Sequence, residues 1–177
     1  FDRTRFNPSQ MSQAALTAGM VPARFVPLIE SAIRGQADYS VDGWEEFFTL
    51  FERGDIECIP KDAAHFLYDD AKQFLRVRGK DVVIVTAGRR AIQVRKVERT
   101  GVLPLVADVI YTDREIKGEV LAARYPNALP DAVFVDDSTK QLASVAEHCP
   151  WIKVYEIQRD RSDSGKFTLI RTLDEIP

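Results

Sequence analysis

The segment "AVFVDDSTKQL" at residues 132–142 joins a short apolar run to two adjacent aspartates, Asp136 and Asp137. An apolar run of this length predicts a strand that is buried on both faces, and the carboxylates follow where that strand should end. Adjacent carboxylates repel each other, which raises a pKa unless a cation lies between them. A turn in which one aspartate caps the next helix explains only one of the two. A hard divalent cation such as Mg²⁺ would compensate both.

Short apolar runs alternate with helical patterns on both sides of this segment. Before it come "DVVIVTAG", a helical stretch at residues 88–100, "ADVIYT" and a short helix after Lys117, and after it come another helix and "IKVYEI". Strands that alternate with helices predict a parallel sheet with helices on both faces. Ligands of such sheets bind at the carboxyl ends of the strands. The sequence therefore predicts an α/β fold with a Rossmann-like parallel sheet and a site at that edge.

The first third of the chain has the pattern of helices alone. "RFVPLIESAIRG" and "VDGWEEFFTLFERG" place apolar residues at helical spacing and end at Gly35 and Gly54. A longer helix is predicted from about Pro60 to about Gly79, and its apolar face consists of Leu67, Ala71, Phe74 and Leu75. We therefore expect a small all-helical unit in front of the α/β part.

Composition excludes several classes of protein. The chain has 177 residues, of which 45% are hydrophobic, which suits one globular domain or one domain with a modest insertion. A net charge of −3 with scattered Lys and Arg gives no sign of a nucleic-acid face. The two cysteines, Cys58 and Cys149, lack metal-ligand spacing, and no signal peptide or long apolar span is present. We expect a cytoplasmic protein that binds neither nucleic acid nor membrane.

Three polar features lie at or near the carboxyl ends of the predicted strands: Thr86, Lys117 and the aspartate pair. Thr86 alone could be the N-cap of the following helix. Lys117 alone could be a solvated helix lysine, although a cation near a helix start is disfavoured by the macrodipole. The three features together are a much more specific signature of a functional site than any one of them.

In this order the features resemble the motifs of the haloacid dehalogenase (HAD) superfamily of hydrolases. The second motif would be "VVIVT", ending at Thr86, the third Lys117 in "REIKGEVL", and the fourth "VFVDDS". The resemblance covers residues 60–177 well, and the helical first third resembles the cap that these proteins insert after their first motif. It implies a helical cap at residues 7–78 and a HAD-like core formed by residues 1–6 and 79–177.

The resemblance also implies a function: a Mg²⁺-dependent phosphomonoester hydrolase that forms an aspartyl-phosphate. Thr86 and Lys117 would be catalytic and would bind the substrate together with Ala87, and Asp136 and Asp137 would hold Mg²⁺. The substrate would be a small phosphorylated metabolite, enclosed by the cap. Aromatic residues of the cap could line its pocket or form the cap's own core, namely Trp44, Phe47, Phe48 and Phe51.

The first motif of the family, a strand followed by Asp-x-Asp-x-Thr, is missing from this chain. In one alignment "FDRT" is the remainder of that motif and Asp2 is the general acid/base. In the other, "FDRTRF" follows the motif, and this fits better because Arg5 lies poorly where the first alignment wants an apolar residue. Both alignments place the missing strand and its nucleophile immediately upstream of residue 1.

Other functions remain open. A protein of this fold that binds or regulates without catalysing would also lack the nucleophile, but it has no need of a paired carboxylate. A dehalogenase or phosphomutase of the same family would use nearly the same residues, although a dehalogenase has less need of Mg²⁺. A two-component receiver domain would place its aspartate pair before the threonine and lysine. A dinucleotide-binding domain would need a glycine-rich turn that "TAGRRA" does not provide.

Overall fold

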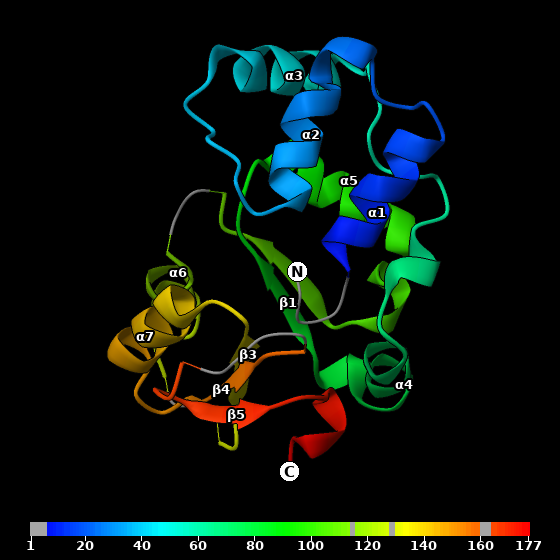
Figure 1. The fold of residues 1–177 in the computed structure, drawn as a ribbon. Coiled ribbons are helices and arrows are strands. Elements are labelled where there is room, and N and C mark those ends of the chain that lie inside the picture. Colours follow the sequence, from blue (N-terminus) through cyan, green and yellow to red (C-terminus); the bar gives the residue numbers. More distant parts are fainter. Residues whose placement is uncertain (1–6, 114–115, 128–129, 160–163) are drawn as a thin grey trace.

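The computed structural model describes residues 7–113, 116–127, 130–159 and 164–177. An all-helical cap lies at one end of the molecule, and the strands with their flanking helices lie at the other (Figure 1). The cap helices are α1, Pro8–Thr17, α2, Val26–Ile33, and α3, Asp42–Arg53. A 3-10 helix, η1 at Ala23–Phe25, precedes α2. The predictions for α2 and α3 are confirmed.

The aromatic face of α3 forms the centre of the cap. Its buried side chains are Trp44, Phe47, Phe48 and Phe51. Phe47 meets Phe25 edge to face, with ring centroids 5.4 Å apart, a favoured arrangement of aromatic pairs. The helix ends at Gly54, whose φ of +79° suits glycine best.

The long helix predicted from about Pro60 to about Gly79 is shorter than expected. A 3-10 helix, η2 at Ala64–Phe66, is followed by extended backbone at Leu67 and Tyr68, and α4 then covers Asp69–Arg78. Asp69 and Asp70 lie in its first turn, where carboxylates are favoured by the macrodipole. The acidic pair therefore favours a helix start at this point, and the prediction of a start near Pro60 was wrong.

The strands form two parallel sheets. β1, Val83–Thr86, pairs with β2, Asp108–Tyr111, while β3, Val133–Asp136, β4, Lys153–Ile157, and β5, Thr168–Ile170, form the second sheet in that order. The first four strands are those that the sequence predicts. The sequence pattern missed β5, which has only three residues.

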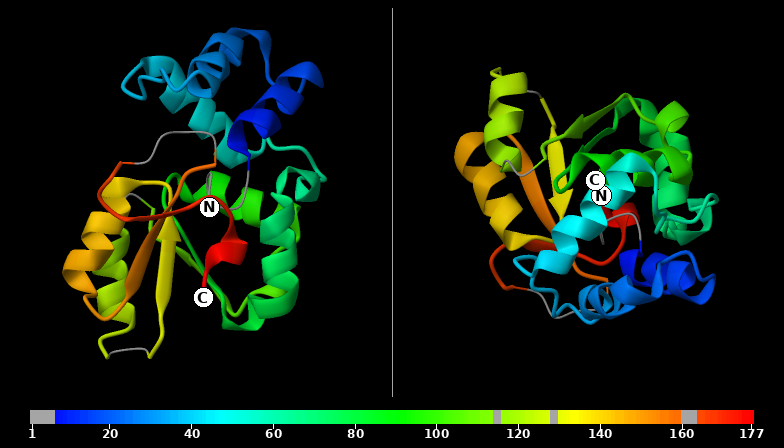
Figure 2. Two further views of the ribbon diagram at one scale, coloured as in Figure 1. Left: turned by 60° about the horizontal axis from the view of Figure 1, so that its bottom comes forward. Right: turned by 90° about the horizontal axis from the view of Figure 1, so that it is seen from above.

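Helices cover both faces of the strands (Figure 2). They are α5, Arg90–Thr100, α6, Lys117–Arg124, and α7, Thr139–His148. On one face Leu121 of α6 shares an apolar cluster with Ile110 of β2 and Phe134 of β3. The two sheets thus belong to one layer, and the predicted α/β fold with a parallel sheet and flanking helices is confirmed, although its hydrogen-bond ladder is in two parts.

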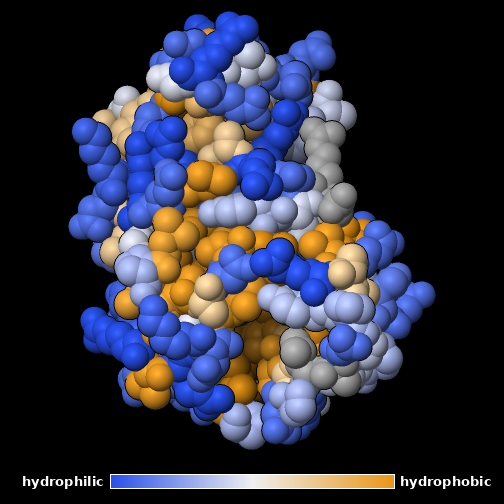
Figure 3. Space-filling view, turned by 180° about the vertical axis from the view of Figure 1, so that it is seen from behind, coloured by the Kyte–Doolittle hydropathy of each residue, from blue (hydrophilic) through white to orange (hydrophobic). Residues whose placement is uncertain are grey.

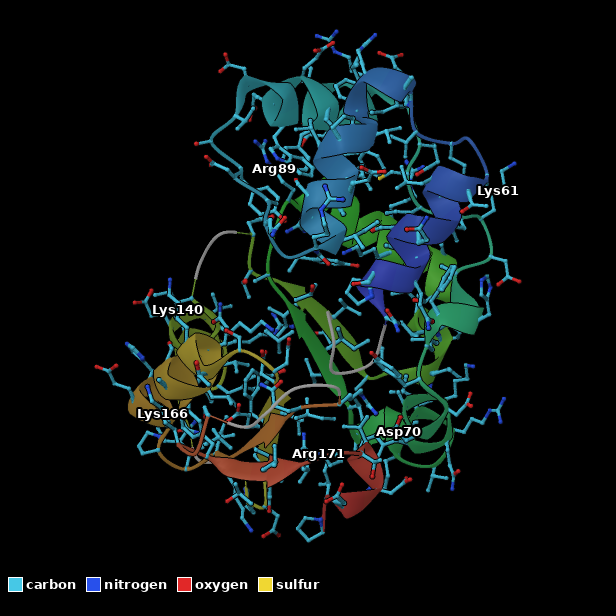
Figure 4. The ribbon with its side chains drawn as sticks, in the orientation of Figure 1. Lys61, Asp70, Arg89, Lys140, Lys166 and Arg171 are labelled. Carbon is cyan, nitrogen blue, oxygen red and sulfur yellow. The ribbon has the colours of Figure 1, made fainter. Side chains whose placement is uncertain are left out.

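Helix α4 lies on the other face of both sheets. Its Leu75 packs with Ile84 of β1, and its Ala71 packs with Tyr155 of β4. Asp70, labelled in Figure 4, accepts two hydrogen bonds of 2.9 and 2.8 Å from Arg159, which follows β4. The helix therefore joins the two sheets, and the cap boundary at residue 78 stays a prediction.

Two further 3-10 helices connect these elements, η3 at Gly79–Asp81 and η4 at Leu103–Leu105, and a third, η5 at Leu173–Glu175, follows β5. Within the described parts of the chain, no helix has the length and apolar character that crossing a membrane requires.

Candidate functional site

Thr86 ends β1 and is buried, with 1% of its surface exposed. Its hydroxyl donates a 3.0 Å hydrogen bond to Oε1 of Gln93 in the second turn of α5. The N-cap of α5 is Arg89, and no side chain caps that helix. Thr86 is therefore not a helix cap, and its hydroxyl faces a neighbouring element at the carboxyl end of the strand.

Lys117 and Asp136 form a buried ion pair. Nζ of Lys117 lies 2.6 Å from Oδ2 of Asp136, and each side chain is only 6% exposed. Lys117 is the first residue of α6, and its backbone N–H is bound by Oε1 of Gln141 at 2.9 Å. Oδ1 of Asp136 accepts a 2.9 Å hydrogen bond from the backbone N–H of Ser138. Both oxygens of Asp136 thus have partners, and Lys117 is not a solvated helix lysine.

Packing between two helices brings Lys117 to this place. Gly118 follows it, and a Cβ at Gly118 would lie 2.3 Å from the carbonyl oxygen of Ser144 on α7. Only glycine permits so close an approach of α6 to α7. The close packing of α6 on α7 therefore explains the glycine after Lys117. The same packing brings the lysine to the end of β3.

Asp137 is half-buried, and its backbone carbonyl accepts a 3.1 Å hydrogen bond from the side chain of Gln158. The same Gln158 side chain donates to Glu156 at 2.9 Å. Glu156 pairs in register with Asp136 on the neighbouring strand and is completely buried. The backbone N–H and the hydroxyl of Ser164 also bind Glu156. The sequence analysis missed Glu156, although an acidic residue inside the apolar run "KVYEI" is a usable signal.

A groove separates β1 from β3. It has a volume of about 540 Å³, and Lys117 and Asp136 lie among the residues that line it. From β1 it is lined by Val83 and Val85, and from β3 by Val133, Phe134 and Val135. In the described residues no backbone hydrogen bond joins the two strands, so both edges facing the groove are unpaired. Seen from behind, the lower half of the molecule is hollowed and its lining is apolar (Figure 3).

A second cavity, of about 550 Å³, lies between the cap and the turn after β1. Ala87 and Gly88 of that turn line it, together with Trp44, Phe47 and Phe48 of α3. These three aromatic residues therefore form both the cap's core and part of a pocket wall, while Phe51 is buried in the core and is not part of the lining. Arg89, which also lines the cavity, lies beside the cap helices in Figure 4.

The structure brings together only some of the predicted site residues. Lys117 and Asp136 are in direct contact, and Asp137 follows at the same strand end. Thr86 lies at the end of β1, across the groove, and Ala87 next to it faces the cavity under the cap. Asp2, considered as a general acid/base, lies outside the described residues.

The carboxylates at the end of β3 meet the ligand requirements of Mg²⁺ only in part. Mg²⁺ usually keeps several waters and binds through one or two carboxylates plus phosphate oxygens. Asp136 and Asp137 provide two carboxylates at one strand end. No group of three or more His, Cys, Asp or Glu side chains among the described residues could hold a metal ion. A complete shell therefore needs oxygens from substrate, water or further protein groups.

Comparisons with known proteins show which solved structures share the fold of this chain. No protein-family model matches the chain, and no curated protein matches it. A solved dehalogenase with an intermediate complex is similar to it with a TM-score of 0.60 and 14% identity, over 97% of this chain and 90% of that one. A protein of Burkholderia xenovorans LB400 named as a haloacid dehalogenase-like hydrolase has a TM-score of 0.57 and 20% identity, over 88% and 80%.

A third similar structure is the HAD-hydrolase YfnB of Bacillus subtilis, in a form bound to magnesium. Its TM-score is 0.56 and its identity 18%, over 95% of this chain and 77% of that one. Identities this low establish the fold alone. The chain has the fold of haloacid dehalogenase-like hydrolases, as its motifs predict.

Proposed function

We propose that the protein is a Mg²⁺-dependent phosphomonoester hydrolase that acts on a small phosphorylated metabolite through an aspartyl-phosphate. The observation that carries this proposal is the buried pair of Lys117 and Asp136, with 2.6 Å between Nζ and Oδ2, at the carboxyl end of a parallel strand. Burying an ion pair is costly, so a fold gains little stability from placing one there. A cation fixed at the edge where α/β proteins bind ligands suits the charge of a phosphoryl group.

The nucleophile belongs in the groove between β1 and β3. Among the described residues nothing pairs with the edges that the two strands present to it, and the valines that line it are only partly buried. A further parallel strand of apolar residues would pair with both edges and join the two sheets. A carboxylate at the end of that strand would lie at the same edge as Lys117. We place this strand in the segment upstream of residue 1.

Each site residue then has a role. Lys117 compensates the nucleophile's charge and the negative charge on the phosphoryl oxygens. The Thr86 hydroxyl exchanges its bond to Gln93 for a phosphoryl oxygen, and the backbone of Ala87 binds the same group. Asp136 and Asp137 would hold Mg²⁺, which would supply positive charge for the phosphoryl oxygens. Gln158 fixes the backbone of Asp137.

Dehalogenation is the second candidate, and one contact favours it. Because Lys117 already compensates Asp136, that carboxylate has a counter-charge without a metal ion. One of the similar structures is a dehalogenase. A carboxylate in the groove could equally displace a halide from carbon, and water would then hydrolyse the ester.

The test is turnover by the intact gene product. We expect hydrolysis of p-nitrophenyl phosphate that requires Mg²⁺, and no halide release from 2-chloropropionate. Halide release that is independent of Mg²⁺, without phosphate release, would refute the phosphatase function and support the dehalogenase function. If neither substrate reacts and the upstream segment encodes no carboxylate after an apolar run, the protein is a binding module.

A further inference from the structure

We propose that the cavity under the cap binds the leaving group of the substrate, and that this group is flat and apolar and carries a second anion. This inference rests on the proposed phosphatase function, because it takes the phosphoryl group to lie at Thr86 and Lys117. It names the substrate class that the walls of the cavity select.

The wall formed by the cap is aromatic. The rings of Trp44 and Phe48 are stacked, with centroids 5.5 Å apart and planes inclined by 22°, and both residues line the cavity. Its volume of about 550 Å³ is in the range of small-molecule sites. Trp44 is 3% exposed, and its indole N–H has no hydrogen-bond partner among the described residues. A buried donor without an acceptor is costly, and we assign a ligand oxygen as its partner.

The opposite wall is one face of α5 and the turn before it. Arg89, Gln93 and Lys96 line the cavity and are spaced by four and three residues, which places them on one side of the helix. Gln93 is in contact with the Thr86 hydroxyl. Lys96 lies about 4.5 Å further along the helix axis, at 1.5 Å per residue. A polar stripe thus leads from the phosphoryl site to a cation about one helical turn away.

The charges of this lining favour an anion. Among the described residues that line the cavity, Arg89 and Lys96 are the charged ones, and none carries a carboxylate. Arg89 is already engaged, because it forms an ion pair with Glu45 and its guanidinium lies 4.6 Å from the ring centroid of Phe48. Lys96 forms no ion pair within the described residues.

Cys58, a further lining residue, adds no negative charge. Burial, followed by the nearby Glu57 carboxylate, raises the pKa of the Cys58 thiol to about 12, so the thiol is neutral near pH 7. The lining is therefore positive at Lys96, and most of its other residues are apolar, with hydroxyls at Ser12 and Tyr39 among the described residues. A phosphosugar would find few hydrogen-bond partners for its hydroxyls there, whereas an aryl phosphate with a carboxylate would bury its ring and pair its anion.

The experiment is calorimetric binding to the intact gene product, with phosphonates that cannot be hydrolysed. We expect phenylphosphonate to bind about tenfold more tightly than methylphosphonate because the ring is buried. We expect 4-carboxyphenylphosphonate to bind about tenfold more tightly again because of a charge-assisted contact with Lys96. The variant Lys96→Met should lose the second gain and keep the first. The matched control is Lys61→Met, an exposed lysine of the cap side that does not line the cavity (Figure 4).

The outcomes separate this inference from the phosphatase function. Equal binding of all three phosphonates, or a carboxylate gain that persists in Lys96→Met, would overturn the inference and leave phosphoryl binding intact. Binding of benzoate that depends on Lys96, without any binding of phosphonates, would support the cavity and refute the phosphoryl site. If neither benzoate nor any phosphonate binds, the inference is wrong.

Discussion

The ion pair of Lys117 and Asp136 is nearly closed to solvent, with 6% of each side chain exposed. Removing one partner leaves the other charge buried and uncompensated, which costs far more than losing a surface contact. We expect Lys117→Met to lower the free energy of unfolding by about 3–5 kcal/mol in urea titrations. The double variant Lys117→Met/Asp136→Asn should regain most of that loss. A loss as small as that of the exposed control Lys140→Met would show that the pair does not form.

Glu156 is a second buried carboxylate, and neutral donors surround it. Burial raises the pKa of Glu156, but its hydrogen bonds from the hydroxyl and backbone of Ser164 and from Gln158 together hold that pKa below its ordinary value. Such a group stabilises the fold at pH values above the pKa of the unfolded chain, and this stabilisation is lost as the pH falls through the lowered folded-state pKa.

Glu156→Gln should therefore flatten the dependence of stability on pH. We expect the wild type to lose more stability than the variant between about pH 6 and pH 3, a window set by the ordinary pKa of about 4.3 for Glu. Urea unfolding at a series of pH values measures this, with the exposed Glu147→Gln as the charge-matched control. Parallel curves for wild type and variant would contradict the lowered pKa.

The sequence predicted where the candidate site residues lie along the strands and helices but not which residues they contact. Lys117, Asp136 and Asp137 stand at strand or helix ends, where a pattern can place them. Gln93 was missed because seven residues separate it from Thr86, and nothing local indicates that its side chain turns back to that hydroxyl. The buried contact between Lys117 and Asp136 depends on how α6 packs on α7, which no local pattern encodes.

At the scale of elements, the packing of α6 on α7 is decided by one glycine. A Cβ at Gly118 would lie 2.3 Å from the carbonyl oxygen and 2.4 Å from the hydroxyl of Ser144, both closer than real contacts allow. We expect Gly118→Ala to destabilise the protein by about 1–3 kcal/mol, despite the better helix propensity of alanine. It should also lower activity because Lys117 moves with α6.

The matched control is Gly43→Ala in α3. A Cβ there meets only the flexible end of Leu28, at 3.0 Å, so this variant should be neutral or slightly stabilising in thermal unfolding. If the two substitutions changed stability equally, the close approach of α6 to α7 would not be the reason for glycine at residue 118.

Element types were predictable because short β-branched runs and helical apolar spacing are local signals. The three-residue β5 was too short for that signal, and the start of α4 depends on its acidic first turn rather than on its apolar face. The division into two sheets was not predictable, because the sequence of a strand does not indicate which other strand pairs with it. The valines on the facing edges of β1 and β3 suit a buried strand equally well with or without a partner.

At the scale of the whole molecule, metal binding should stabilise the fold by mass action. With free Mg²⁺ at about 100 times its Kd, the gain in unfolding free energy should be about 2.7 kcal/mol. Asp137→Asn should remove most of this gain, and the exposed Asp174→Asn should retain it. Thermal unfolding of the intact gene product with and without Mg²⁺ measures both. A wild-type Tm that does not respond to millimolar Mg²⁺ would count against the site.

We propose that a strand upstream of Phe1 fills the groove and carries the nucleophile beside Lys117. The most direct measurement is acid quenching of the intact gene product during turnover of an aryl phosphate, followed by peptide mapping of the phosphorylated residue by mass spectrometry. We expect a phosphoryl group on an aspartate in the segment before Phe1, at the end of an apolar run. An adduct on Asp136 or Asp137, or turnover with no adduct in that segment, would contradict it.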